Sequence, residues 1–138
     1  EARVKKRYDA VVAGDWPQGL RTVRHSLRRH TLQSGERRVR IDLHGDKART
    51  DFEVQQRGAR VTRLWVYPHT GRTHQIRVHA AAEGHAVVGD NKYQLNGPDV
   101  PRMMLHSSSL KLPDGRRFDA DPDETFLETW SHLMGGDD

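Results

Sequence analysis

Apolar and polar side chains alternate along most of this chain, and this alternation limits the possible folds more than any other feature. The period of two runs through residues 7–12, 38–55 and 59–67, and it is typical of strands that bury one face. We interpret 38–55 as a hairpin that turns at residues 44–47, and 59–67 as a third strand that ends at Pro68. The chain is therefore expected to build an antiparallel or mixed sheet.

Two segments depart from this period and are predicted as helices. Residues 74–83 follow a Gly turn, come directly after Thr73 as a capping residue, and end before Gly84. Residues 123–134 carry their aromatic and aliphatic side chains at helical spacing. A further hairpin is expected to turn at residues 113–115. The predicted class is α+β, with a mixed, mainly antiparallel sheet and two or more helices packed on it.

Length and composition exclude several kinds of protein. At 138 residues the chain is long enough for one domain or part of one. No apolar run approaches the roughly 20 residues that cross a bilayer, so we predict no membrane contact and a cytoplasmic protein. The chain has no cysteine, which excludes disulfides and thiolate metal sites. It begins at Glu1, directly in a charged strand-like segment, which predicts a piece of a longer protein.

Positive charge is concentrated near the start of the chain. Residues 1–40 hold eleven lysines and arginines against four acids, whereas the last twenty residues hold seven acids and no lysine or arginine. A basic cluster beside an acidic remainder is typical of a protein that holds a phosphate backbone on one face. Lys5, Lys6, Arg28 and Arg29 are candidate contacts to such a phosphate backbone, and a solvated charged surface is the alternative.

The run from His69 to His79 is the densest group of polar donors in the chain. It places two arginines, Arg72 and Arg77, beside the start of the predicted helix. Backbone N–H groups at a helix start and nearby arginines favour an anion such as a phosphate or a carboxylate. The alternative is a capped surface helix with solvated arginines.

Other chemistries have little support in the sequence. His74 and His79 are five residues apart, which places them on different sides of a helix, and no Glu completes a zinc-protease motif. Ser107, Ser108 and Ser109 lack the flanking glycines of a hydrolase nucleophile. No Gly-rich phosphate loop is present. We therefore predict no metal and no nucleotide cofactor.

Six short motifs occur in an order that matches a known family. They are Lys5 to Gly14, Leu32 to Arg37, Lys47 to Phe52, Thr70 to His79, Gly84-His85 with Val88 to Tyr93, and Leu105-His106. On these residues the chain resembles the RluA-type pseudouridine synthases, and among them the RluC-like enzymes that modify large-subunit ribosomal RNA. The resemblance implies a cofactor-free isomerase that breaks the N1–C1′ bond of a uridine in RNA, rotates the base and rejoins it through C5.

The resemblance also implies roles for individual residues. The family tyrosine that packs against the target base and assists removal of its C5 proton corresponds to Tyr8. The arginine that pairs with the catalytic carboxylate corresponds to Arg77. Arg72, His74 and Gln75 are expected to contact RNA or to support the framework of the site. An edge-strand tyrosine and a surface arginine are the plain structural alternatives for Tyr8 and Arg77.

One family motif has no counterpart in this chain. The nucleophilic aspartate of the family lies in an HRLDxxTSG motif, upstream of the segment that corresponds to residue 1, and no such motif occurs here. We therefore interpret residues 1–138 as the C-terminal portion of a catalytic domain. Alone it is expected to be inactive and to expose sheet edges and apolar surface, which favours self-association. A non-catalytic RNA-binding module, or a structural basic domain that binds other polyanions, remains an alternative.

Overall fold

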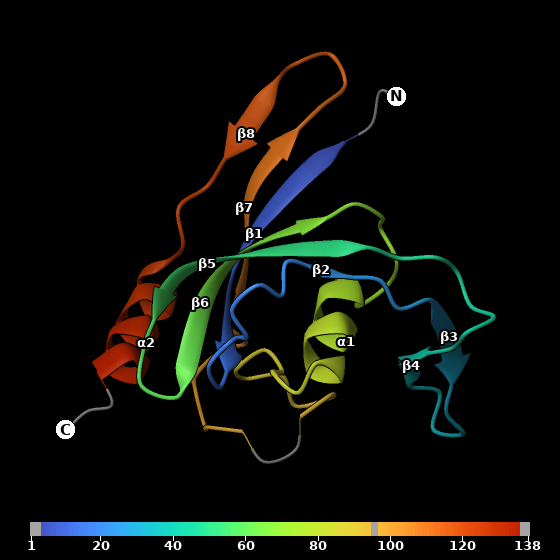
Figure 1. The fold of residues 1–138 in the computed structure, drawn as a ribbon, viewed down its shortest axis with the longest axis horizontal. Coiled ribbons are helices and arrows are strands. Elements are labelled where there is room, and N and C mark those ends of the chain that lie inside the picture. Colours follow the sequence, from blue (N-terminus) through green and yellow to red (C-terminus); the bar gives the residue numbers. More distant parts are fainter. Residues whose placement is uncertain (1–3, 95–96, 136–138) are drawn as a thin grey trace.

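A computed structural model describes residues 4–94 and 97–135 of the chain. The elements are β1 (Lys5–Ala13), β2 (Thr22–Val23), β3 (Leu27–Thr31), β4 (Arg37–Ile41), β5 (Thr50–Arg57), β6 (Val61–Pro68), α1 (Gln75–Ala82), β7 (Leu105–Lys111), β8 (Arg117–Asp119) and α2 (Glu124–Gly135). One sheet has the order β2-β5-β6-β1-β7-β8, with antiparallel neighbours, and β3 pairs with β4 in a separate hairpin (Figure 1). The predicted α+β class with a mainly antiparallel sheet is confirmed.

Strand β1 lies inside the sheet and buries both of its faces. Ala10 packs in a cluster with Ile76 of α1, whereas its neighbour Val11 packs with Phe126 and Trp130 of α2. Successive side chains of a strand point to opposite faces of the sheet, so the two helices cover opposite faces. This arrangement leaves the start of β1 and the start of α1 on the same side of the sheet, which is where the candidate site lies.

The predicted hairpin over residues 38–55 is wrong. Its two halves are both strands, but β4 pairs with β3 and β5 pairs with β6. The backbones of Leu27 and Asp46 exchange two hydrogen bonds of 2.8 Å, which hold the connecting loop against β3 instead of letting it turn back along β4. Leu43, expected on the buried face, is 89% exposed. Alternation identifies a strand but carries no information about its partner.

Strands β2 and β3 were not predicted from the sequence, whereas the other elements follow the prediction closely. The third strand is β6, the predicted C-terminal hairpin is β7 with β8, and the helix expected over 123–134 is α2. Helix α1 ends before Gly84, whose φ of 83° is left-handed and suits Gly. Thr73 is not the capping residue, because His74 occupies the N-cap with φ 53° and no side-chain cap bond is made. The turn needs one left-handed residue at that point, and this shifts the helix start by one position.

Helix α1 is anchored to β5 by a histidine that is completely buried. His79 Nδ1 lies 2.8 Å from the Thr50 hydroxyl, and His79 Nε2 lies 2.9 Å from the backbone oxygen of His25. Its Nε2–H therefore donates to the carbonyl and its Nδ1 accepts from Thr50. Burial lowers the pKa of His79 from its usual 6.5 and outweighs the hydrogen bond to His25 that favours the charged ring.

Acid is expected to destabilise the fold through His79. Its pKa is lower in the folded than in the unfolded chain, so this stability is complete above pH 6.5 and is lost as the pH falls from 6.5 toward the folded pKa, by at most about 1.4 kcal/mol per pH unit. Urea unfolding across this range should show a shallower pH dependence in His79→Gln than in the parent. His132→Gln, at an exposed histidine, is the control, and equal slopes in both variants would contradict the assignment.

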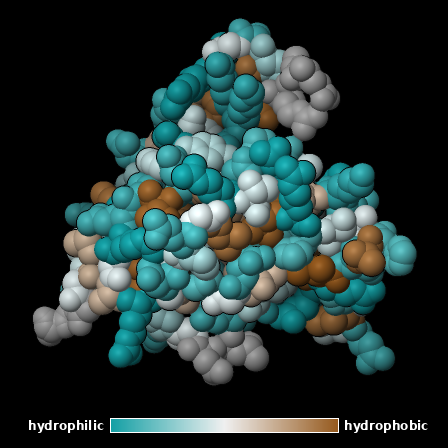
Figure 2. Space-filling view, viewed as in Figure 1, coloured by the Kyte–Doolittle hydropathy of each residue, from teal (hydrophilic) through white to brown (hydrophobic). Residues whose placement is uncertain are grey.

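The surface is largely hydrophilic on the face that Figure 2 shows, with small hydrophobic patches, one of them over the end of the molecule that carries β3 and β4. Ile41 and Leu43 are exposed there, and Phe118 is exposed on β8. Singly exposed apolar side chains are common on protein surfaces, so the exposure expected from a missing segment and the self-association both stay predictions. Within residues 4–94 and 97–135, no helix has the length and apolar character needed to span a bilayer.

Candidate active site

A pocket of about 240 Å³ lies where the start of β1 meets the turn between β6 and α1. Its lining is Lys6, Tyr8, Pro68, Thr70, Gly71, Arg72, His74, Gln75, Ile76, Arg77 and Leu105. Six of the nine site residues predicted from the sequence are in this lining, although the chain brings them from β1, from a turn and from α1. We refer to this cavity as the Tyr8 pocket.

Tyr8 is held in the pocket by pairing on both sides of its strand. Its backbone lies opposite Val66 of β6 and Ser107 of β7, and the register of β1 with β7 shifts between Arg7 and Tyr8. A bulge of this kind redirects a side chain and is common beside active sites. The ring is partly buried against the core cluster that contains Ala10 and Val66, so Tyr8 is not an edge-strand tyrosine.

The turn before α1 is built around the side-chain amide of Gln75. Its oxygen accepts from the Thr70 hydroxyl at 2.6 Å and from the Arg72 N–H at 3.2 Å. Its nitrogen donates to the Arg49 carbonyl at 2.8 Å and to the Thr50 hydroxyl at 2.9 Å. These bonds use both amide protons and both oxygen lone pairs. Of the two roles expected for Gln75, the geometry therefore favours framework support over RNA contact.

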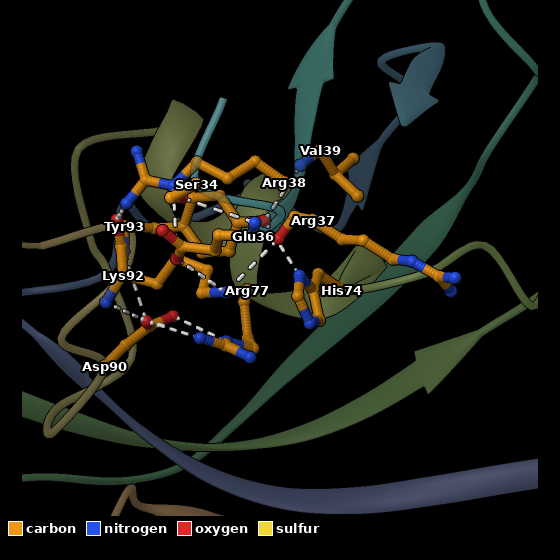
Figure 3. Close-up of polar contacts among 10 residues, drawn as sticks. All are labelled: Ser34, Glu36, Arg37, Arg38, Val39, His74, Arg77, Asp90, Lys92 and Tyr93. Carbon is orange, nitrogen blue, oxygen red and sulfur yellow. Dashed lines mark hydrogen bonds and ion pairs between the residues drawn. The ribbon is translucent and has the colours of Figure 1, made fainter. Parts of the chain in front are cut away.

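Arg77 extends from the first turn of α1 and binds the carboxylate of Asp90 through two bonds. Arg77 Nε and Nη2 donate to the two Asp90 oxygens at 2.9 and 2.8 Å (Figure 3). The backbone N–H groups of Lys92 and Tyr93 donate to the same carboxylate. Burial opposes ionisation of Asp90, but these donors outweigh it and lower the pKa of Asp90, and the pair raises the pKa of Arg77.

Among the described residues, the lining of the Tyr8 pocket has positively charged side chains but no negatively charged one. Lys6, Arg72 and Arg77 line it, and no Asp or Glu of the described residues does. Asp90 is held behind Arg77 with its side chain fully buried. Asp9 is also buried and binds Arg63 through two bonds of 2.9 and 2.6 Å. Neither carboxylate is free to approach a ligand in the pocket.

The other predicted RNA contacts lie outside the Tyr8 pocket. Arg29 lines a neighbouring cavity of about 260 Å³ that shares Gly71 and Arg72 with it. Arg28 points elsewhere, because its guanidinium binds Asp42 at 2.9 Å and the His44 carbonyl at 3.1 Å. Lys5 is exposed at the start of β1 and lines neither cavity. The structure therefore places Lys6 in the Tyr8 pocket and Arg29 in the neighbouring cavity, while Arg28 and Lys5 lie outside both.

The two histidines considered as metal ligands have separate partners. His74 Nδ1 lies 2.8 Å from the Tyr93 hydroxyl, whereas His79 is buried against Thr50. In the described part of the chain, no three His, Cys, Asp or Glu residues are grouped in a way that would hold a metal ion.

Comparison with known proteins places this geometry in a family. The model of the RNA pseudouridylate synthase family matches residues 1–82, which include Tyr8 and Arg77. The chain belongs to this family. The family resemblance inferred from the six motifs is therefore confirmed.

Relatives of the synthase family match most of this chain but are much longer. Ribosomal large subunit pseudouridine synthase C of Salmonella typhi is 40% identical over 121 residues, and the protein of that name from Escherichia coli K12 is 39% identical. Each match covers 81% of this chain and 38% of the relative. The chain thus spans about two fifths of the length of these relatives.

Solved structures of the synthase family share the fold. Human RNA Pseudouridylate Synthase Domain Containing 1 superposes with a TM-score of 0.76 and 33% identity, covering 92% of this chain and 57% of that one. Human RNA Pseudouridylate Synthase Domain Containing 4 superposes with a TM-score of 0.75 and 20% identity, covering 94% and 62%.

Sequence reasoning assigned no role to Asp90, Lys92 or Tyr93, which interact with residues that line the Tyr8 pocket in the structure. All three lie in the Val88 to Tyr93 motif that contributed to the family resemblance. The motif therefore marked these residues in the sequence. Their distance from Arg77 along the chain, however, does not show that the segment after Gly89 folds back against α1. Gly89 has φ 88°, and a Cβ on it would lie 2.6 Å from the Arg102 carbonyl oxygen. That close approach requires Gly and turns the chain toward Arg77.

Proposed function

We propose that this chain forms the Tyr8 pocket of an RNA pseudouridine synthase that acts on ribosomal RNA, with the large subunit as the substrate particle. The observation that carries the proposal is the meeting of Tyr8, Arg77 and two further cations around one pocket without a carboxylate. The names of the curated bacterial relatives support the substrate class. The basic residues beside the pocket suit a polyanion.

The proposed chemistry exchanges one bond of the uridine for another. The N1–C1′ bond breaks, the base rotates, the C5–C1′ bond forms, C5 loses its proton and N1 gains one. Tyr8 lies where a phenol can pack on a base that has left its stack and can receive or relay the C5 proton. Arg77 keeps Nη1 outside its two bonds to Asp90, so it has donors left for a second carboxylate.

We propose that the second carboxylate comes from outside the described residues. Asp90 and Asp9 are buried and each is held by an arginine, so neither fits the role of a nucleophile. The family nucleophile belongs to the HRLDxxTSG motif, which this chain lacks. We propose that residues 1–138 are the C-terminal portion of a catalytic domain and that an HRLD-containing segment completes the pocket.

The chain alone is expected to show no uridine isomerisation. Ribosomal RNA labelled with tritium at uridine C5 should release no tritium above background with residues 1–138. The same RNA should release tritium with a longer polypeptide in which an HRLD-containing segment precedes residue 1. Release by the chain alone would contradict the missing carboxylate.

A non-catalytic RNA-binding module is the second candidate, because a cationic pocket without a carboxylate is also suited to binding alone. The longer polypeptide separates the two candidates. Binding of ribosomal RNA without tritium release would favour the module. Equal binding of RNA and heparin, with equal salt dependence, would favour a structural domain for polyanions.

A further inference from the structure

Tyr93 connects the β3–β4 hairpin to the Tyr8 pocket. Its hydroxyl accepts from the Val39 N–H of β4 at 3.0 Å and lies 2.8 Å from His74 Nδ1 (Figure 3). Its ring packs with the cluster of Leu27, Val39, Ala48 and Val78, and the Arg77 guanidinium lies 5.2 Å from the ring centre. One side chain therefore contacts the hairpin, His74 and Arg77.

The protons around the Tyr93 hydroxyl can be assigned from these contacts. The hydroxyl accepts the Val39 N–H, and it has a single proton of its own to donate. His74 Nδ1 is the acceptor within reach at 2.8 Å. If Nδ1 carried a proton instead, the hydroxyl proton would lose this acceptor. The arrangement that satisfies every group leaves Nδ1 unprotonated and places the ring proton of a neutral His74 on Nε2.

The charges around His74 keep the ring neutral. Burial and the positive charges of Arg77 and Lys92 lower the pKa of His74, and the carboxylate of Asp90 only partly opposes them. Lys92 is itself fixed by Glu36 of the hairpin, at 2.8 Å. At neutral pH the imidazole is therefore a single-proton donor and not a cation.

The backbone of His74 supports a role beyond packing. His74 has φ 53°, and outside Gly this left-handed conformation is uncommon and costs roughly 1 kcal/mol or more. His74 is one of the residues that line the Tyr8 pocket. The His74 and Tyr93 rings are T-shaped to one another, with 5.6 Å between centres. The turn thus accepts a strained residue in the lining of the cavity.

We propose that Tyr93 is a positioning residue that holds His74 in its Nε2–H form, and that this N–H donates to a carbonyl oxygen of the uracil base in the Tyr8 pocket. The inference rests on the proposed function for the identity of the base, but the form of the His74 ring can be measured without it. It adds a neutral donor for the base to the cations that line the pocket.

A base carbonyl fits this donor better than a phosphate does. A phosphate at Nε2 would favour the imidazolium and would raise the pKa of His74. Arg77 and Lys92 stand beside the ring and oppose that charge. A neutral donor next to Pro68, Ile76 and Leu105 in the lining suits the edge of a base, which offers neutral acceptors.

The first experiment measures the ring form in the chain as it is. Two-bond ¹H–¹⁵N spectra of the histidine-labelled chain, with His74 assigned by its loss in His74→Asn, should show Nε2 protonated and Nδ1 unprotonated. Tyr93→Phe should convert this single form to a mixture of both and move the pKa of His74 toward 6.5. Tyr67→Phe, which removes a hydroxyl bonded to Glu53 at 3.3 Å, should change neither. A mixture in the parent chain would overturn the proposal.

The second experiment tests the acceptor with two small ligands. Uridine 5′-monophosphate should shift the His74 Nε2 signal without raising its pKa, and ribose 5-phosphate should not shift it. His74→Asn tolerates a left-handed backbone and keeps an acceptor for Tyr93, but it lacks the Nε2–H. It should bind uridine 5′-monophosphate about tenfold more weakly than the parent and unfold at the same urea concentration.

Two results would overturn the base contact. One is an equal shift with ribose 5-phosphate or a rise in the pKa of His74, which would assign the acceptor to a phosphate. The other is the absence of a shift with both ligands. These measurements need no turnover, so they fail independently of the synthase assignment, which the tritium experiment tests.

Discussion

Replacing Tyr8 by Phe in the longer polypeptide that we propose as the synthase is expected to slow tritium release from C5-labelled uridine by at least about a hundredfold. This is the smaller end of what a positioned acid or base contributes. The substitution keeps the ring that packs against the core and removes only the hydroxyl. Because Tyr8 is held between β6 and β7, the variant should fold and bind RNA as the parent does. Rates and RNA affinity should be measured under identical salt.

Tyr67→Phe is the matched control for this loss. Tyr67 lies on β6, its hydroxyl contacts Glu53, and it is not in the lining of the Tyr8 pocket. It should leave the rate within about twofold of the parent. A Tyr8→Phe enzyme that releases tritium at the parent rate would remove Tyr8 from the proton transfer and leave it a packing role.

Replacing Arg77 by Met is expected to destabilise the fold by about 3 kcal/mol, the range for breaking one side of a buried ion pair. Asp90 has a fully buried side chain and would keep only its two backbone donors. Its pKa should rise, so the loss should shrink as the pH falls and Asp90 becomes protonated. Urea unfolding at several pH values measures both effects.

Two variants control this measurement. Arg117→Met breaks an exposed pair with Asp119 and should cost far less, because exposed pairs contribute little. Asp90→Asn in the Arg77→Met background should restore part of the stability by removing the buried charge. If Arg77→Met cost no more than Arg117→Met, the buried pair would have no role in the fold, and the assignment of Arg77 to the site would lose its structural basis.

Asp9 and Asp90, two buried aspartates, show which parts of the site the sequence could not predict. The run from Thr70 to His79 is dense in donors and contains Arg77, whereas Tyr8 lies in the Lys5 to Gly14 motif. The family motifs therefore predict both residues from the sequence. The pattern of the run itself indicated an anion beside α1, and the carboxylate of Asp90 occupies the Arg77 fork. Asp9 and Asp90 cannot be distinguished from surface aspartates in the sequence, because their burial depends on strands and turns from distant segments.

Strand pairing likewise depends on distant segments and could not be predicted from the local sequence. Residues 37–41 and 50–57 have the right period, and both are strands. Their partners depend on hydrogen bonds between Leu27 and Asp46 and on the long contact of β5 with β6. A local pattern reports which face of a strand is buried, but many registers and partners satisfy the same pattern.

The amino-acid sequence by itself determined the class of this protein, its two helices and most of its strands, its family, and six of the residues that line the Tyr8 pocket. Those properties depend on local period, turn chemistry and motifs, all of which are properties of short segments. Only the tertiary structure decided that β4 pairs with β3, that Asp90 binds Arg77, and that Tyr93 contacts both the β3–β4 hairpin and His74. Each of these joins segments far apart in the chain, and their partners are selected by burial and by the need of every buried polar group for a hydrogen bond.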